Sequence, residues 1–207
     1  LRVKLLRSLP GEGCKTLLVT GTMPGEGKTT VACNLALSLS RNGDRVILAD
    51  MDLRKPSVKR TLGITEPSRG GMELLELEGT SLKIFAGDDG GGDVKQSDIV
   101  KLSGMLKRLR ENTDYIILDT PPCGLVADSF SAAGSADYAI YVVGCGMANA
   151  AHILDSMQSL AESGAPIVGC VINGVSGGSR KYGYGYGYGY GKYGGAYGAK
   201  RKTDGAE

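Results

Sequence analysis

A glycine-rich segment, GTMPGEGKTT at residues 21–30, has the residue types that hold a phosphate group. Gly25 and Gly27 let backbone N–H groups close around a phosphate, Lys28 can reach the β- and γ-phosphates of a nucleotide, and Thr29 can bind magnesium. The usual spacing, G-x-x-x-x-G-K-[ST], requires a first glycine at position 22, but Thr22 stands there and glycine comes one place earlier. A chance glycine-rich loop is the alternative. Because a strand and a helix are expected on either side, we predict a phosphate-binding loop.

Three aspartates follow apolar runs elsewhere in the chain. Asp50 and Asp52 stand in VILADMDLR, and Asp119 stands in YIILDTPP. A single aspartate in such a place is more often a turn or helix-cap residue. Phosphoryl transfer from ATP, however, needs magnesium, a lysine on the phosphates and a carboxylate that orients the nucleophile. The three acids and the loop together therefore predict ATP-dependent phosphoryl transfer.

The elements that must position these residues alternate between apolar runs and helical patterns. Gly43 is the expected stop signal of a helix that begins near Lys28. Such alternation predicts an α/β fold, with a mainly parallel sheet flanked by helices on both faces and a ligand site at the carboxyl ends of the strands. The expected strands are 16–20, 45–50, 82–86, 115–119, 138–143 and 167–173, the other clear helices are 98–112 and 148–163, and 87–93 is an expected surface loop.

Composition divides the chain into a body and a tail. The chain has 207 residues and a net charge of +2; residues 1–179 hold 18 Lys and Arg against 20 Asp and Glu, whereas residues 180–207 hold 6 against 2. We predict a domain at 1–173 and a flexible Gly/Tyr-rich tail at 174–207. The slightly acidic body argues against a nucleic-acid partner, which would need clustered cations.

The cysteines and the apolar runs bear on the cellular compartment and on membrane spans. The five cysteines form no C-x-x-C pair, and most are predicted to be small buried residues of a reducing cytosol. No apolar run approaches the roughly 20 residues that span a bilayer. Because the chain begins at Leu1 without a methionine, we expect it to be part of something longer.

The tail concentrates tyrosine. An alternating Tyr/Gly run is a poor independent strand, because glycine adds backbone entropy and leaves one face without side chains. Three interpretations compete: a low-complexity tail without a role, a stacking surface for single-stranded nucleic acid, and a set of phosphate acceptors. Seven of the ten tyrosines lie here, Tyr182, Tyr184, Tyr186, Tyr188, Tyr190, Tyr193 and Tyr197.

The order and the residue types of these motifs resemble those of the bacterial tyrosine kinases, an exopolysaccharide-associated family built on a P-loop NTPase-like scaffold. Its second motif, D-x-D-x-R, matches Asp50, Asp52 and Arg54, and its third, D-x-x-P, matches Asp119 and Pro122. A tyrosine cluster at the carboxyl end is a further hallmark. The resemblance covers the chain from about residue 14 to its end.

This resemblance implies a role for each matched residue. Lys28 and Thr29 would hold ATP and Mg²⁺, Asp50 would be a magnesium ligand and the orienting base, and Asp52 and Asp119 would complete the metal shell. Asp128 is a weaker candidate. Further nucleotide contacts are expected from Pro24, Gly25, Glu26, Gly27, Thr30 and Asn173.

The resemblance also implies partners. The substrate would be the chain's own tail, phosphorylated between subunits of a homo-oligomeric ring. A membrane-bound polysaccharide co-polymerase, fused or separate, would hold the domain in the cytoplasm at the inner face of the membrane. The family's ring motif, E-x-x-R-x-x-R, has only Lys4 and Arg7 as its nearest match. The alternative is a partitioning-type ATPase on the same scaffold, but the position of its signature lysine is occupied by Met23.

Charge suggests how phosphorylation would act on the tail. Each phosphate adds about −1.5 to −2 charges at pH 7, so full modification reverses the sign of the basic tail. We expect an unmodified tail to approach an acidic rim that contains Asp50, Asp52, Asp119 and bound nucleotide, and a heavily phosphorylated tail to be repelled by the same groups.

Overall fold

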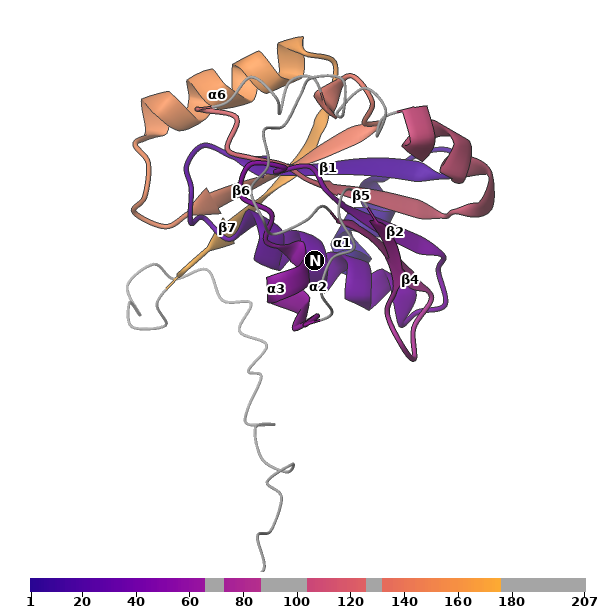
Figure 1. Cartoon of the computed structure of the whole chain (residues 1–207). Helices are drawn as coiled ribbons and strands as arrows, with labels where there is room; N and C mark the ends of the chain where they lie inside the picture. Colours follow the sequence, from indigo (N-terminus) through magenta and orange to yellow (C-terminus); the bar gives the residue numbers. More distant parts are fainter. Residues whose placement is uncertain (66–72, 87–103, 126–131, 176–207) are drawn as a thin grey trace, which may run out of the picture. The chain divides into compact units, whose positions relative to one another are not determined.

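A seven-stranded sheet forms the centre of the computed structural model, which describes residues 1–65, 73–86, 104–125 and 132–175 (Figure 1). Its strand order is β3-β4-β2-β5-β1-β6-β7. Neighbouring strands run parallel except for β3, which pairs antiparallel with β4 at one edge. The strands are β1 (Lys15–Gly21), β2 (Val46–Asp50), β3 (Glu73–Glu76), β4 (Leu82–Ala86), β5 (Tyr115–Asp119), β6 (Tyr138–Gly144) and β7 (Ile167–Asn173).

Helices cover both faces of this sheet, as the sequence predicts. Helices α1 (Arg2–Ser8), α2 (Lys28–Ser40) and α3 (Val58–Leu62) lie on one side, and α6 (Ala150–Glu162) lies on the other (Figure 1). A helical segment at 104–109 runs into the 3-10 helix η1 (Arg110–Asn112). The six expected strands and the helices at 28–40 and 150–162 are confirmed. The expected loop at 87–93 and the first part of the expected helix 98–112 lie outside the described residues.

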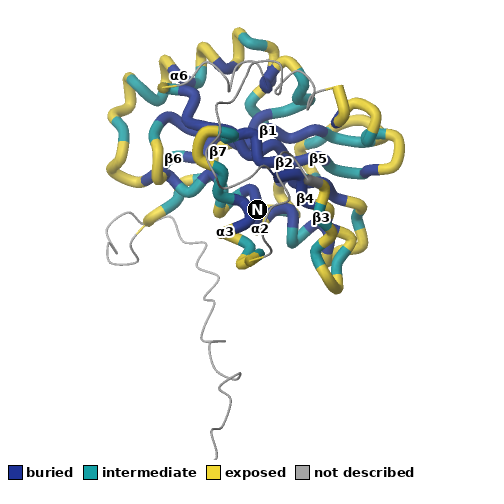
Figure 2. Tube along the Cα trace, in the orientation of Figure 1, coloured by how far each residue is buried: buried dark blue, intermediate teal, exposed yellow. Residues whose placement is uncertain are grey.

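Alternating strand residues supply two separate cores. Leu17 and Val19 of β1 join the core under α2, whereas Leu18 joins the core under α6. The central strands are therefore buried on both sides, as Figure 2 shows for β1, β2 and β5. This burial explains why parallel strands appear in the sequence as continuous apolar runs.

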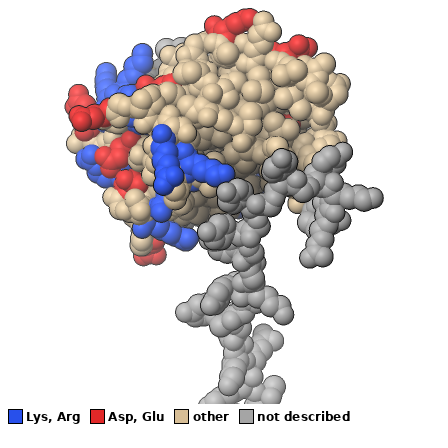
Figure 3. Space-filling view, turned by 180° about the vertical axis from the view of Figure 1, so that it is seen from behind, with Lys and Arg blue, Asp and Glu red and all other residues tan. Residues whose placement is uncertain are grey.

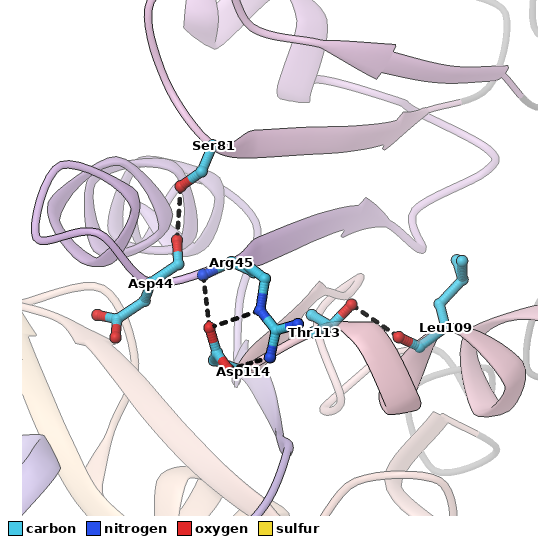
Figure 4. A network of polar contacts seen from close by, with 6 residues as sticks. All are labelled: Asp44, Arg45, Ser81, Leu109, Thr113 and Asp114. Atoms are coloured by element: carbon cyan, nitrogen blue, oxygen red, sulfur yellow. Dashed lines mark hydrogen bonds and ion pairs between the residues drawn. The ribbon is translucent and has the colours of Figure 1, made fainter.

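The register of β2 against β5 brings two carboxylates together. Asp50 is the register partner of Asp119 at the carboxyl ends of these strands. At the opposite ends, Asp114 accepts a hydrogen bond from the backbone N–H of Arg45 at 2.7 Å and pairs with the Arg45 guanidinium at 2.8 Å (Figure 4). Nearby, the Ser81 hydroxyl donates to the carbonyl of Asp44 at 2.6 Å (Figure 4). These contacts hold the beginnings of β2 and β5 in register. The same register places Asp50 beside Asp119 at the carboxyl ends of the two strands.

One expectation about the surface needs correction. Cys33 and Cys123 are buried, but Cys170 is exposed on the edge strand β7, and Cys145 is exposed in the turn after β6. The near-neutral body also has an uneven surface: charged side chains gather on one half of the face shown in Figure 3 and are sparse on the other. Within the described part of the chain, none of the helices is long and apolar enough to cross a membrane.

Candidate active site

The glycine-rich loop joins β1 to α2 in a conformation that only its glycines permit. Gly25 and Gly27 have φ values of 82° and 93°, in the left-handed region. A side chain at Gly27 would also overlap the amide of Asn173. Gly21 is needed for a different reason, because a Cβ there would overlap the carbonyl oxygen of Val142 in β6. The close packing on β6 thus explains why glycine stands at 21.

A buried polar contact accounts for Thr22, which occupies the position of the usual first glycine. The Thr22 hydroxyl lies 2.8 Å from the hydroxyl of Tyr141, on β6, and both side chains are fully buried. The Cys123 thiol lies 3.7 Å from the same Tyr141 oxygen. Burial raises the pKa of Tyr141, so the phenol stays neutral and can serve as donor or acceptor. Thr22 therefore anchors the start of the loop.

Two predicted nucleotide contacts support the loop from behind. Glu26 is only 1% exposed, and its carboxylate accepts a hydrogen bond from the N–H of Met23 at 2.8 Å. Asn173, at the end of β7, donates from its amide to the carbonyl of Glu26 at 2.9 Å. Lys28 donates to the carbonyl of Met23 at 2.6 Å, and burial lowers the pKa of its ammonium group. The loop is thus held in shape by side chains from β7 and from its own residues.

The two register-paired aspartates are buried and differ in their partners. The side chain of Asp50 accepts N–H groups from Ser57 at 2.8 Å, Val58 at 3.0 Å and Asp52 at 3.2 Å. One oxygen of Asp119, Oδ1, has no hydrogen-bond partner among the described residues. Burial raises the pKa of Asp50 to about 6. Burial, reinforced by the nearby Asp50 carboxylate, raises the pKa of Asp119 to about 8.

The unpartnered oxygen of Asp119 fits a magnesium site. A buried carboxylate oxygen without a partner is costly unless a cation or a donor approaches it. Thr29 lowers the pKa of Asp119, so a hydroxyl of the type that binds Mg²⁺ lies beside this acid. Among the residues described, no group of three or more His, Cys, Asp or Glu side chains could hold a metal ion alone. Magnesium commonly keeps several waters and binds phosphate oxygens, so a partial protein shell suits it.

A cavity of about 510 Å³ opens beside these acids, within the size range of ligand pockets. Its walls come from the phosphate loop, from the segment after β2 and from the segment after β5. Asp50, Asp119, Glu26 and Asn173 are not among the lining residues. Those are Pro24, Gly25, Gly27, Lys28, Thr29, Thr30, Asp52, Arg54, Lys55, Ser57, Arg60, Thr61, Pro121, Pro122 and Leu125.

The expectation of an acidic rim is wrong. Of the three acids invoked, Asp52 lines the cavity, whereas Asp50 and Asp119 are buried beneath it with raised pKa values. The cations that line the cavity are Lys28, Arg54, Lys55 and Arg60. The charged side chains that line the cavity are therefore mostly basic, and they would not repel a phosphorylated tail.

The structure adds site residues that the sequence interpretation missed. Lys55, Ser57 and Arg60 line the cavity, and the Ser57 hydroxyl lies 2.9 Å from that of Thr29. A signal was present, because the segment RKPSVKR at 54–60 holds four cations in seven residues. Asp128 lies outside the described residues, as do all the tail tyrosines, so their predicted roles remain predictions.

Comparisons with known proteins agree with this geometry. The CobQ/CobB/MinD/ParA nucleotide binding domain family matches residues 17–182. Tyrosine-protein kinase CpsD of Streptococcus pneumoniae serotype 4 is 34% identical over 187 residues, which cover 84% of this chain and 82% of CpsD. Tyrosine-protein kinase YwqD of Bacillus subtilis is 30% identical, over 77% of this chain and 72% of YwqD.

A solved structure supports the fold. The kinase domain of Escherichia coli tyrosine kinase ETK superposes with a TM-score of 0.74, over 89% of this chain and 77% of that domain. At 24% identity this likeness carries the fold alone.

Proposed function

The chain belongs to the CobQ/CobB/MinD/ParA nucleotide-binding family and, within it, to the bacterial tyrosine kinases, and from this membership we propose that it phosphorylates the tyrosines of its own carboxyl-terminal segment. The observation that carries the proposal is the single cavity that joins Lys28 and Thr29 of the phosphate loop to the carboxylate of Asp52. The acceptors are Tyr182, Tyr184, Tyr186, Tyr188, Tyr190, Tyr193 and Tyr197.

The phosphate loop provides the donor side of the reaction. The backbone N–H groups of residues 25–30 and the Lys28 ammonium hold the phosphates of ATP, the substrate. Thr29 and Asp119 would hold magnesium, with Asp50 behind them. When bound, the ion neutralises charge that develops on the phosphate oxygens. Lys28 is already folded over the loop through its bond to Met23, so little rearrangement is needed for it to reach a phosphate.

The acceptor side requires a carboxylate within the cavity. The sequence interpretation gave the orienting role to Asp50, but that side chain is fully buried and accepts three backbone N–H groups. Asp52 is half-buried and lines the cavity. A phenol has a pKa near 10, and a loose transition state makes modest demands on a base. We therefore assign the orientation of the tyrosine hydroxyl to Asp52 and keep Asp50 as a support of the metal side.

The length of the tail allows it to reach its own cavity or that of a neighbour. About 24 residues separate Asn173 from Tyr197, which span at most ~80 Å when extended and ~27 Å on average for a glycine-rich coil. The family resemblance favours transfer between subunits of a homo-oligomer. It also favours a membrane-bound polysaccharide co-polymerase, fused or separate, that holds the domain at the inner face of the cell membrane.

Loss of Lys28 tests this function. Lys28→Met should abolish phosphotyrosine formation with ATP and magnesium, because no other cation lies on the phosphate loop itself. Exposed Lys107→Met, outside the lining of the cavity, serves as the matched control and should keep the parental rate. Equal phosphotyrosine in Lys28→Met and the parent, measured by antibody and by label from γ-³²P-ATP, would reject the proposal.

A further inference from the structure

The lining of the cavity includes cations that the proposed transfer does not use. Lys55 and Arg60 are exposed and line the same cavity as Lys28 and Thr29. Lys28 already serves the nucleotide, and Thr29 the metal. The remaining basic side chains therefore face a space where a second anionic group could bind.

This basic segment is held firmly against the site. Asp50 accepts the N–H groups of Ser57 and Val58, and the Ser57 hydroxyl contacts that of Thr29 at 2.9 Å. The N–H of Lys55 donates to the Asp52 carboxylate at 3.1 Å. The backbone that carries Lys55 and Arg60 is thus bonded to Asp50 and Asp52 through Lys55, Ser57 and Val58, at the start of α3.

The chemistry of the tail identifies which group these cations suit. An unmodified tyrosine is neutral, and residues 180–207 hold 6 Lys and Arg against 2 Asp and Glu, so a basic wall offers the unmodified tail no attraction. A phosphotyrosine carries about −1.5 to −2 charges and three acceptor oxygens, which are the groups that Arg and Lys bind. Recognition therefore begins only after a tyrosine has been phosphorylated.

We propose that Lys55 and Arg60 form a phosphotyrosine subsite that retains one modified tyrosine of the tail while the next tyrosine enters the reaction centre. The inference rests on the proposed function, since the tail must be the substrate. Tyr182, Tyr184, Tyr186, Tyr188 and Tyr190 alternate with single residues. In an extended chain, residues two apart point to the same side about 6.6 Å apart. A retained phosphotyrosine thus presents a second phenol to the same cavity, and transfers after the first become faster.

Direct binding tests the subsite without requiring catalysis. The probe is a peptide of residues 180–190 with phosphate on Tyr186, compared with the unmodified peptide, on full-length Lys28→Ala protein saturated with ADP and magnesium. We expect the phosphopeptide to bind at least tenfold more tightly. Combined Lys55→Gln and Arg60→Gln should remove most of this preference, whereas Arg41→Gln and Arg108→Gln, exposed cations outside the cavity lining, should keep it.

Three results would overturn the subsite. One is equal affinity for the two peptides, and another is equal loss of preference in both double variants, which would indicate a general charge effect. The third is competition of the phosphopeptide with ADP, or with inorganic phosphate at the phosphate loop, which would place the phosphate at the nucleotide. Because these assays measure binding, a failed subsite is distinguishable from a failed kinase, which would show no phosphotyrosine in the parent protein.

The order of phosphorylation provides the second readout. With the subsite intact, intact-mass spectra at low turnover should show tails with several phosphates beside unmodified tails. The Lys55→Gln and Arg60→Gln variant should show tails with one phosphate first, and the Arg41→Gln and Arg108→Gln control should match the parent. Accumulation of singly phosphorylated tails in the parent would contradict retention.

Discussion

At the scale of single residues, the site depends on two carboxyl groups that the fold buries side by side. Asp50 and Asp119 are register partners at the ends of β2 and β5, and both are at most 1% exposed. Asp50 gains three backbone N–H partners, whereas Asp119 keeps an oxygen without one in the described structure. Asp119 is therefore the acid whose charge has most to gain from a bound cation.

The burial of Asp119 predicts how the free energy of unfolding depends on pH when no ligand is bound. The pKa of Asp119 is raised to about 8, from 3.8 in an unperturbed side chain. Between these values the folded protein holds a proton that the unfolded chain has released, so the free energy of unfolding falls as pH rises. Without nucleotide and magnesium, the melting temperature of the parent should fall by several degrees relative to Asp119→Asn between pH 5.5 and 8. Scanning calorimetry of both, with exposed Asp155→Asn as control, measures the difference.

Magnesium nucleotide should remove this dependence, because a nearby cation favours the charged carboxylate. Binding should also release a proton, detectable as a buffer-dependent heat in titration calorimetry. Parent and Asp119→Asn melting curves that stay parallel across the whole pH range would mean that Asp119 does not titrate there.

Variants of the two aspartates of the second motif should differ, one in reaction rate and the other in stability. Asp52→Asn should lower phosphotyrosine formation by about 10²-fold, a usual contribution of a general base, with little change in melting temperature. Asp50→Asn removes one carboxylate acceptor, and an unsatisfied buried N–H costs about 1–3 kcal/mol, so its melting temperature should fall. Kinetics and thermal unfolding of both variants check this. A parental rate in Asp52→Asn would return the orienting role to Asp50.

At the scale of elements, the phosphate loop is shaped by strands far away in the chain. Gly21 packs against the carbonyl of Val142 in β6, and Asn173 of β7 donates to the carbonyl of Glu26. Strand order places β6 next to β1 and β7 next to β6, so both supports approach the loop from one side. The conformation of the phosphate loop thus depends on β6 and β7, the two strands at one end of the sheet.

Asn173→Ala tests this support. Removing a hydrogen bond of about 0.5–1.5 kcal/mol should raise the KM for ATP by roughly 3–10-fold, with a smaller effect on kcat, because the loop would sample more conformations before nucleotide binds. Asn42→Ala, which alters an exposed asparagine away from the loop, is the control. A KM for ATP that is the same in Asn173→Ala and the parent would show that the loop holds its shape without β7.

The sequence predicted those helices and strands whose apolar residues recur with a regular period. Buried parallel strands and the amphipathic or loop-flanked helices were found because their apolar periodicity is local. Strand β3 was missed, since Glu73–Glu76 is short, contains two glutamates and pairs only at an edge. Helix α3 has five residues, too few to show a period.

The sequence predicted the site residues that lie together in short motifs, but not those that tertiary contacts bring to the cavity. Lys28, Thr29 and Asp52 line the cavity as expected of site residues, although their roles are proposals. The burial of Asp50 could not be predicted, because it follows from N–H donors seven and eight residues away that turn back onto the strand end. The same tertiary contact carries Lys55 and Arg60 to the cavity, which is why an acidic rim was expected in place of a basic wall.

At the scale of the whole molecule, the chain contains both an enzyme and a candidate substrate. An active protein that ends at residue 175 should phosphorylate a full-length Lys28→Met partner when the two are mixed, because the tail of one copy can enter the cavity of another. Separation of the two by size, followed by phosphotyrosine detection, gives the result. A mixture with full-length Lys28→Met and no active chain is the control. No phosphate on the inactive partner would leave transfer within one chain.

The central claim is that this kinase transfers phosphate to its own tail, and site mapping tests it most directly. The purified protein is incubated with ATP and magnesium, and phosphate is located by mass spectrometry of its peptides over time. We predict phosphate on tyrosines between Tyr182 and Tyr197 and none on Tyr115, Tyr138 or Tyr141, which belong to the sheet. ATP hydrolysis without phosphotyrosine in the tail would contradict the account and favour a partitioning-type ATPase.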